Sequence, residues 1–452
     1  MNQKQIYFLE NFSFRYPYSE KAIQWSGNIS INENEILLIS GKSGAGKSTF
    51  LYALKGLLPD TIFGKLKGKI LFKGKDVSQL SSFEKAKIGF LFQNPAAQMI
   101  NRTVIQEIAF GMENLQMKQQ EIRKKIEDFA ETFKIKHLLK RDVTTLSGGE
   151  KQKVALISIL AMNPEVLLFD EPTAFLDPIS ASEFFAVFRN IVKNKTVVIV
   201  EHNLDYLKDS VSGFIKIGAN GKIEKKDLKE IPWTQKFPRL PNISKGEKLI
   251  EIKNLSFSYD NNHILKGLNF ELRKKEIIGI IGANGAGKTT LLKLIAGVLK
   301  SKNGKISYKH ENIEHISFKK YYRNLALLFQ NPENHFLFSE VEREIAGNRK
   351  ILDLVGLNKM QKRNPFTLSE GEKRRLSLAI LWNLKREIFL FDEPTFGQDY
   401  ENKNKLIELI GKMREKGNSF IIVSHDYPFL NSVCDKIFLL KNGYLRETQI
   451  QN

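Results

Sequence analysis

The sequence has little cysteine and lacks long apolar runs. Its single cysteine, Cys434, cannot form an internal disulfide, so we expect a small core residue in a reducing compartment. One of the longest apolar stretches, Val154 to Met162, is broken by Ser158, and a membrane-spanning helix needs about 18 or more apolar residues. No N-terminal stretch combines a basic start with an apolar core. The chain is therefore not expected to cross a bilayer by itself.

What is present is the composition of a folded protein with more than one domain. The 452 residues are 42% hydrophobic and 27% charged, which excludes collagen-like repeats and wholesale disorder. This length allows two large domains or about three average ones. The 70 lysine and arginine residues outnumber the 50 acidic ones, for a net charge of +20. Because the basic residues are scattered, an anionic membrane surface or a lysine-rich proteome explains this charge better than a nucleic-acid partner.

An internal repeat organises the chain. Residues 10–16 return as residues 253–259, and the glycine-rich residues 41–48 return as residues 282–289. The later pairs keep the same order and are 93–95 with 330–332, 146–150 with 368–372, 170–173 with 392–395, Asp177 with Asp399, and His202 with His425. The nearly constant spacing indicates two homologous domains. The second copy has about 15 fewer residues between Gln330 and Ser369.

The repeat sets the domain boundaries and the fold class that we predict. The first domain covers residues 1–226, the linker residues 227–247 and the second domain residues 248–452, and the linker carries Pro232, Pro238 and Pro241. The predicted strands are 36–39, 166–169, 196–200, 277–281, 388–391 and 420–423, and helices are predicted over 48–58 and 289–299. This alternation predicts an α/β fold in which helices cover a mainly parallel sheet.

Both glycine-rich segments stand between a predicted strand and a predicted helix, which is the setting of a phosphate-binding P-loop. The glycines let backbone N–H groups wrap nucleotide phosphates, and Lys47 or Lys288 adds a positive charge. The hydroxyls of Ser48 and Thr289 can ligate Mg²⁺. The expected nucleotide-binding residues are Gly41, Ser43, Gly44, Gly46, Lys47, Ser48 and Thr49 in the first copy, and Gly282, Asn284, Gly285, Gly287, Lys288, Thr289 and Thr290 in the second.

Each copy also places two acidic residues at the end of an apolar strand. These pairs are Asp170 with Glu171 and Asp392 with Glu393, and ligands bind at the carboxyl ends of parallel strands. We expect Asp170 and Asp392 to hold Mg²⁺. Glu171 and Glu393 would orient and deprotonate the attacking water.

A histidine follows a later apolar strand in each copy. His202 and His425 both precede a turn that contains an acidic residue. Either histidine alone would more often be structural. With P-loops upstream, we predict that each senses the γ-phosphate or the attacking water and so belongs with the catalytic residues.

The most diagnostic segments are residues 146–150 (LSGGE) and 368–372 (LSEGE), each upstream of an Asp-Glu-Pro-Thr element. Ser and Gly at a helix start offer a hydroxyl and open amides to an anion, although a plain N-cap is the simpler alternative. With these signatures the chain resembles a tandem ATP-binding cassette (ABC) ATPase over nearly its whole length. The resemblance implies two P-loop NTPase domains, each with an antiparallel β subdomain and a helical subdomain. It also implies two ATP molecules per chain, Mg²⁺, and no need for a homodimer.

The resemblance assigns roles that the residues alone do not. Each signature would complete the site of the opposite domain, so that Ser147 and Gly149 face Lys288, and Ser369 and Gly371 face Lys47. Glu370 stands where the family usually has glycine. The remaining assignments are Gln93 and Gln330 as Mg²⁺ ligands that relay contact to a membrane partner, Tyr16 and Tyr259 as the aromatics that stack on adenine, and Asp177 and Asp399 in the loop that crosses the domain interface. A surface turn for each glutamine and an ordinary strand position for each tyrosine remain open.

One branch of the family fits best. Residues 93–98 (QNPAAQ) and 109–114 (AFGMEN) resemble the ATPase subunits of energy-coupling factor (ECF) transporters, which import vitamins and transition-metal ions. The second copy departs from the pattern, with His335 for a glutamine and Gln398 where leucine is common. The implied partners are an integral membrane coupling protein and a substrate-binding membrane subunit. The implied location is the cytoplasmic face of the cell membrane, with no nucleic acid expected.

Two other classes stay open. In a twin-cassette sugar importer the second site is usually degenerate, whereas Lys288, Glu393 and His425 all persist here. A soluble ribosome-associated ATPase could use the +20 charge on RNA phosphates, but such proteins place a long charged helical arm where this chain has a short linker. A coiled-coil chromosome ATPase fails for lack of a heptad region. The transported substrate cannot be read from these residues.

Overall fold

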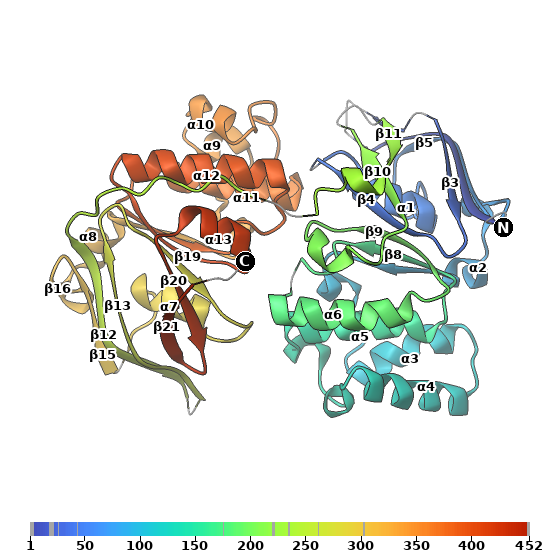
Figure 1. Ribbon diagram of the computed structural model, residues 1–452, viewed down its shortest axis with the longest axis horizontal. Helices are drawn as coiled ribbons and strands as arrows, with labels where there is room; N and C mark the ends of the chain where they lie inside the picture. Colours follow the sequence, from blue (N-terminus) through green and yellow to red (C-terminus); the bar gives the residue numbers. More distant parts are fainter. Residues whose placement is uncertain are drawn as a thin grey trace. The chain divides into compact units, whose positions relative to one another are not determined.

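The structure is a computed structural model that describes residues 4–17, 22–25, 27–42, 44–174, 176–218, 222–233, 236–260, 262–301 and 303–449. Contacts within the chain divide it into two units, Met1–Thr234 and Gln235–Asn452. Each unit holds one copy of the repeat and is an α/β domain (Figure 1).

The central sheet of the first unit has the strand order β11-β10-β4-β9-β8-β7. Its strands are β4 (Ile36–Gly41), β7 (Ile88–Leu91), β8 (Val166–Asp170), β9 (Thr196–Val200), β10 (Gly213–Ile217) and β11 (Ile223–Lys226). All neighbours pair in parallel except β11, which is antiparallel to β10. The predicted strands at 36–39, 166–169 and 196–200 are confirmed.

An antiparallel sheet and a set of helices complete the first unit. In that sheet the order is β2-β1-β5-β6, and β3 also pairs with β1. The strands are β1 (Gln5–Arg15), β2 (Ile23–Gln24), β3 (Asn28–Asn32), β5 (Lys65–Phe72) and β6 (Lys75–Asp76). The helices are α1 (Lys47–Lys55), α2 (Ser82–Ala86), α3 (Val104–Asn114), α4 (Gln119–Thr132), α5 (Gly148–Ala161) and α6 (Pro178–Ile191).

The second unit repeats this plan. Its central sheet has the order β17-β18-β19-β14-β20-β21, with only β21 antiparallel to its neighbour, and its other sheet has the order β13-β12-β15-β16. The strands are β12 (Lys248–Tyr259), β13 (Asn262–Arg273), β14 (Ile277–Ile281), β15 (Asn303–Tyr308), β16 (Glu311–Asn312), β17 (Leu325–Leu328), β18 (Ile388–Asp392), β19 (Ser419–Val423), β20 (Lys436–Lys441) and β21 (Tyr444–Thr448). The helices are α7 (Lys288–Ile295), α8 (Phe318–Tyr322), α9 (Val341–Glu344), α10 (Arg349–Leu354), α11 (Glu370–Asn383), α12 (Tyr400–Glu415) and α13 (Tyr427–Val433). The predicted strands of this half are confirmed as well.

Both central sheets are buried on their two faces. Alternate side chains of β4 enter different hydrophobic cores, Leu38 on one face and Leu37 and Ile39 on the other. In β14 the same alternation separates Ile277 from Ile278. Successive side chains of a strand point to opposite faces, so the near-continuous apolar runs follow from double coverage of a parallel sheet.

The P-loop helices end earlier than predicted. The helices α1 and α7 stop at Lys55 and Ile295 instead of reaching 58 and 299. Gly56 and Gly297, with φ of 70° and 71°, lie just beyond and have left-handed backbones. A left-handed glycine is a common helix terminator, so the apolar residues that follow belong to the connection and not to the helix.

The units differ most between the glutamine loop and the signature. The first unit builds α3 and α4 there, with 11 and 14 residues, whereas α9 and α10 of the second unit have 4 and 6. The predicted shortening of the second copy therefore removes most of two helices. None of the helices in the described part of the chain is long and apolar enough to cross a membrane.

The chain between the repeats is packed along part of its length. Ile231 lies in a core of the first unit. In the second unit the Phe237 ring stacks on Tyr400 at 5.0 Å, and the Leu240 N–H donates to the Ser432 carbonyl at 2.7 Å. The segment after residue 236 therefore runs along α12 and α13.

Candidate active sites

The P-loop of the first unit connects β4 to α1. Gly46 begins the helix with a φ of 96°, a conformation that glycine adopts without strain. The buried Lys47 ammonium donates to the loop's own carbonyls, at 3.0 Å to Gly41 and 3.3 Å to Lys42. Gly44 lies in the same loop, whereas Ser43 lies outside the described residues. A lysine held by main-chain oxygens around a helix N-terminus has the arrangement of a phosphate site.

The second P-loop has the same form and one further contact. Gly287 begins α7 with a φ of 99°, and Lys288 donates to the carbonyls of Gly282 at 2.7 Å and Ala283 at 2.9 Å. Its Nζ also lies 3.3 Å from Nε2 of His425. Of the other candidate nucleotide-binding residues, Gly285 lies in this loop and Thr290 in the first turn of α7.

Each P-loop hydroxyl contacts the acidic residue predicted to hold Mg²⁺. Ser48 Oγ donates to Asp170 at 3.2 Å and Thr289 Oγ1 donates to Asp392 at 2.7 Å. Burial raises the pKa of both aspartates, and Asp170, next to Glu171, reaches about 7. Buried oxygen donors whose ionisation is costly gain from a hard divalent cation, so these residues fit Mg²⁺.

Two other candidate site residues, Gln93 and His202, lie against Glu171. Gln93 donates to its carboxylate at 2.7 Å, and Nε2 of His202 lies 2.9 Å from the other oxygen. Burial alone would raise the pKa of Glu171, but His202, Lys47 and Gln93 outweigh burial and lower it to about 2. At neutral pH this carboxylate is ionised, as a proton acceptor must be.

Sequence reasoning missed Glu201, the residue before His202. Its buried carboxylate accepts from Thr173 Oγ1 at 2.7 Å and from the backbone N–H of His202 at 2.7 Å. Burial raises the pKa of Glu201. Its position after an apolar strand offered a signal, but the repeat has Ser424 there, so the comparison of the two copies did not single it out.

Glu393 has different surroundings. Nε2 of the His425 ring lies 3.4 Å from the Glu393 carboxylate and 3.1 Å from Asn284. The backbone N–H of His425 donates to the same carboxylate at 3.2 Å. Burial raises the pKa of Glu393 to about 8, although Lys288 lowers it. At neutral pH Glu393 therefore holds a proton.

Both glutamates have left-handed backbones. The φ angles are 47° at Glu171 and 51° at Glu393, and each N–H donates across the sheet, to the carbonyls of Val200 and Val423. This region is unfavourable for a residue with a side chain. In each unit the central sheet therefore holds this glutamate in a strained backbone conformation.

The two predicted adenine-stacking tyrosines are placed differently. The hydroxyl of Tyr16 lies 2.8 Å from Thr49 Oγ1, at the start of the P-loop helix. The Tyr259 side chain is 44% exposed. Only the first aromatic is attached to its P-loop in the described residues.

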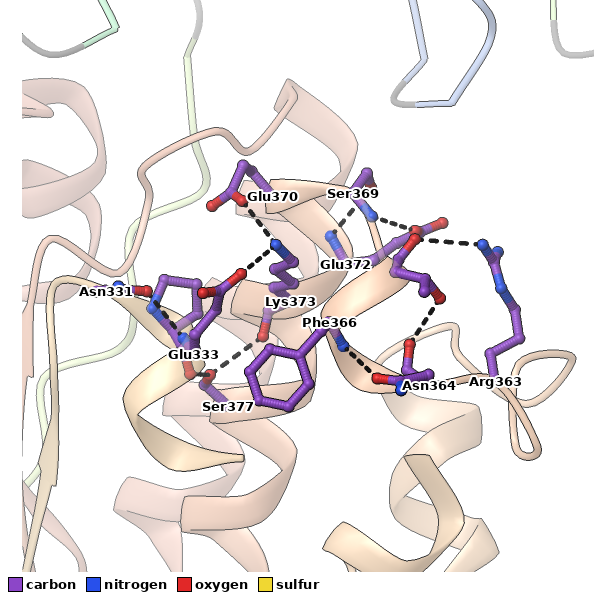
Figure 2. Close-up of polar contacts among 12 residues, drawn as sticks. Asn331, Glu333, Arg363, Asn364, Phe366, Ser369, Glu370, Glu372, Lys373 and Ser377 are labelled. Carbon is purple, nitrogen blue, oxygen red and sulfur yellow. Dashed lines mark hydrogen bonds and ion pairs between the residues drawn. The ribbon is translucent and has the colours of Figure 1, made fainter. Parts of the chain in front are cut away.

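The signature serines are helix N-caps. Ser147 and Ser369 each accept the backbone N–H of the glutamate three residues on, and that carboxylate bonds back to the serine N–H. Figure 2 shows this arrangement for Ser369 and Glu372. Gly149 and Gly371 lie in the first turns of α5 and α11. The simple capping role is thus present, and both serines remain on the surface.

The glutamine loops differ as well. In the described residues the Gln93 side chain donates to Glu171. The Gln330 side chain is exposed, and the backbone carbonyl of Gln330 accepts from Arg374. Sequence reasoning missed Arg374, which a comparison of the copies could have found because Gln152 holds the matching position. His335 bonds to the Leu327 carbonyl at 3.1 Å, in the loop position where Gln98 bonds to that of Phe90.

Comparison with known proteins gives the family. A family model described as "ABC transporter" matches residues 26–174 and 265–396. A Bacillus subtilis protein named "Putative HMP/thiamine import ATP-binding protein YkoD" is 31% identical, over 96% of this chain and 90% of its own. A Methanosarcina mazei protein named "Putative ABC transporter ATP-binding protein" is 32% identical, over 97% of this chain and 94% of its own.

A solved structure agrees on the fold. The archaeal ribosome recycling factor aABCE1, in complex with the ribosomal stalk protein aP1, aligns with a TM-score of 0.67 at 21% identity, over 96% of this chain and 89% of that chain. Similarity at this level of identity speaks for architecture and not for function. Two matched regions, relatives that span nearly the whole chain and a P-loop in each unit lead to one conclusion: the chain belongs to the ABC transporter family and is an ATPase with two ATP-binding domains in tandem.

Proposed function

We propose that the chain is the ATP-hydrolysing subunit of a membrane importer of the ECF type, which moves a vitamin or a transition-metal ion. The observation that carries the proposal is an exposed aliphatic residue at the same place beside both glutamine loops. Ile100 is 70% exposed and Leu337 is 84% exposed, seven residues after Gln93 and Gln330. A single exposed apolar side chain is common on a protein surface, but its recurrence at matching positions beside both glutamine loops supports a docking role.

Buried carboxylates hold both residues in place. Glu107 accepts the backbone N–H of Ile100 at 3.1 Å and of the next residue at 2.8 Å. Glu344 accepts the backbone N–H groups of Leu337 and Phe338, both at 2.7 Å. A preorganised surface loses little entropy when a partner docks. The two glutamates recur at the spacing of the glutamine loops, so a closer comparison of the copies would have found them.

The relatives support a transport role. The Bacillus subtilis protein is named for import and for ATP binding. The proposed partners are an integral membrane coupling protein and a substrate-binding membrane subunit. The net charge of +20 suits attachment to the cytoplasmic face of an anionic bilayer. The similarity to the structure of a ribosome recycling factor supports the fold alone.

The proposed chemistry uses the groups described above. Lys47 binds the phosphates of one ATP. Glu171 takes a proton from the attacking water, and His202 holds that carboxylate in position. Ser48 and Asp170, with Gln93, would hold Mg²⁺, which neutralises phosphate charge when it is bound. The proposal includes the implied pairing of Ser147 and Ser369 with the ATP of the opposite domain.

The test removes the exposed aliphatic pair. In Ile100→Glu with Leu337→Glu, we expect at least tenfold weaker co-purification with two small integral membrane proteins from detergent-solubilised membranes, because each lost burial is worth about 1.5 kcal/mol or more. Phe63→Glu is the matched control, since Phe63 is 73% exposed and lies outside both loops. An unchanged melting temperature shows that the double variant folds. Sedimentation of the unaltered chain with ribosomes instead of membrane proteins would favour the ribosomal class.

A further inference from the structure

A buried lysine in the second unit joins two segments of the ATP site. Lys373 of α11 donates to Glu370, three residues earlier in the signature, at 3.1 Å. It also donates to Glu333, in the loop that begins at Gln330, at 2.5 Å. Figure 2 shows the Lys373 side chain between the two carboxylates. One ammonium group thus bridges the signature and the glutamine loop.

Lys373 is positively charged at neutral pH. Burial alone would lower the pKa of Lys373, but the hydrogen bonds to Glu333 and Glu370 outweigh burial and raise it. Both carboxylates are partly exposed, with side chains 38% and 47% accessible, whereas that of the lysine is 9% accessible. The pair of acids therefore compensates a buried cation, which would be costly to leave alone.

The same face of α11 makes further bonds to the loop. Arg374 donates to the carbonyl of Phe329 at 2.7 Å and to that of Gln330. One turn on, Ser377 donates to the Pro332 carbonyl at 3.1 Å. Residues three or four apart share one face of a helix, so the loop is held at several points along one stripe.

A third segment joins the same helix start. The buried Gln398, which directly precedes Asp399, donates to the Gly371 carbonyl at 3.0 Å. The first unit has Leu176 at this place, and leucine cannot donate. The signature of the second unit is therefore tied by side chains to the segments on both sides of it.

The first unit lacks the groups that make these ties. Lys151 matches Lys373, but Gly148 and Ala96 stand where Glu370 and Glu333 would be. Gln152 and Ala155 replace Arg374 and Ser377. Neither glycine nor alanine offers a carboxylate or a hydroxyl, so the lysine of the first unit has no such bridge.

We propose that Lys373 is a positioning residue that locks the glutamine loop of the second unit to its signature, so that the two segments move together during ATP turnover. The first unit, with Gly148 and Ala96 at the matching positions, has no such bridge between its loop and its signature. Glu370, which replaces the usual glycine, then adds a bond between the two segments and is not a defect of the signature. The inference concerns the ATPase itself and does not depend on the transport role.

Backbone hydrogen exchange on the full chain tests the lock. In Lys373→Met, amides in 330–338 and 368–374 should exchange about tenfold faster, which corresponds to about 1.4 kcal/mol. The matched variant Lys151→Met should leave the exchange of 93–101 and 146–152 unchanged. Lys373→Arg keeps the charge and should restore slow exchange in both segments. Unchanged exchange in Lys373→Met, or acceleration of only one segment, would overturn the proposal.

Two further measurements separate positioning from general stability. In Lys373→Met, kcat should fall about tenfold while KM for ATP stays within about twofold, because neither P-loop is touched. Glu333→Gln should reproduce the effect, and Glu333→Gln combined with Lys373→Met should add little more. Conversely, Ala96→Glu with Gly148→Glu would transplant the lock and slow the exchange of residues 93–101. Additive losses in the double variant would contradict a shared bridge.

Discussion

The two units carry the same motifs and yet differ in the charge state of the residue expected to accept a proton. In the first, His202 lies 2.9 Å from Glu171 and the pKa of that glutamate falls to about 2. In the second, His425 is 3.4 Å away and burial raises the pKa of Glu393 to about 8. A few tenths of an ångström and different buried neighbours separate an anion from a neutral acid. Repeated motifs therefore do not guarantee repeated chemistry.

The largest expected difference is in turnover. Glu171→Gln should lower kcat by about 10²- to 10³-fold at pH 7, since a general base contributes in this range. Glu393→Gln should cost less than about tenfold at the same pH, because a group with a pKa of about 8 already holds a proton. The double variant should still bind ATP and lose turnover. Steady-state hydrolysis by the purified variants checks this.

The difference in turnover between the two single variants should shrink as the pH rises. Above about pH 9 Glu393 is ionised, so the two single variants should become more alike. Equal losses at pH 7, or unchanged hydrolysis in the double variant, would show that these glutamates do not act as bases in the way that the site suggests.

Stability should respond to pH in opposite ways at the two sites. The folded pKa of Glu393 is raised from 4.5 to about 8, so the stability present at low pH is lost as the pH rises between these values. The folded pKa of Glu171 is lowered from 4.5 to about 2, so its stability is present above about pH 4.5 and lost only below.

Denaturant unfolding of the variants measures this contrast. Relative to the unaltered chain, Glu393→Gln should gain roughly 4 kcal/mol of unfolding free energy between about pH 5 and about pH 8.5. Over the same range the difference between Glu171→Gln and the unaltered chain should stay constant. Parallel pH profiles for the two variants would contradict the assignment.

The smallest expected effect concerns the two tyrosines. Tyr16→Phe removes a hydroxyl that lies 2.8 Å from Thr49 and should cost about 1 kcal/mol of stability. Tyr259→Phe removes a hydroxyl from a side chain that is 44% exposed and should change stability by less than about 0.5 kcal/mol. Thermal unfolding of both variants resolves the difference. An equal cost would mean that the Tyr16 contact contributes nothing.

The sequence predicted the positions of the strands and the P-loops because their patterns are local. Apolar runs such as Ile277–Ile281 and glycine-rich loops report on a few neighbouring residues. The helix ends were predicted too late because the apolar residues after Gly56 and Gly297 prolonged the pattern. Those two glycines offered a signal that periodicity overrode.

The electrostatics could not be predicted in the same way. The pKa of Glu171 depends on His202, Lys47 and Gln93, which come from distant parts of the sequence and meet only in the fold. The lock at Lys373 depends likewise on Glu333, forty residues upstream. Burial and distances of this kind follow from packing and not from spacing.

The left-handed turn at residues 171 and 393 has a consequence for engineering. A glycine would adopt φ near 50° without the penalty that a side chain carries, so selection for heat resistance alone would favour glycine at residue 393, whose buried carboxyl destabilises the fold as the pH rises. At residue 171 a glycine would also remove the carboxylate that Gln93 and His202 contact, so heat resistance and turnover both favour glutamate there. Such a selection would therefore alter the second site and leave the first unchanged.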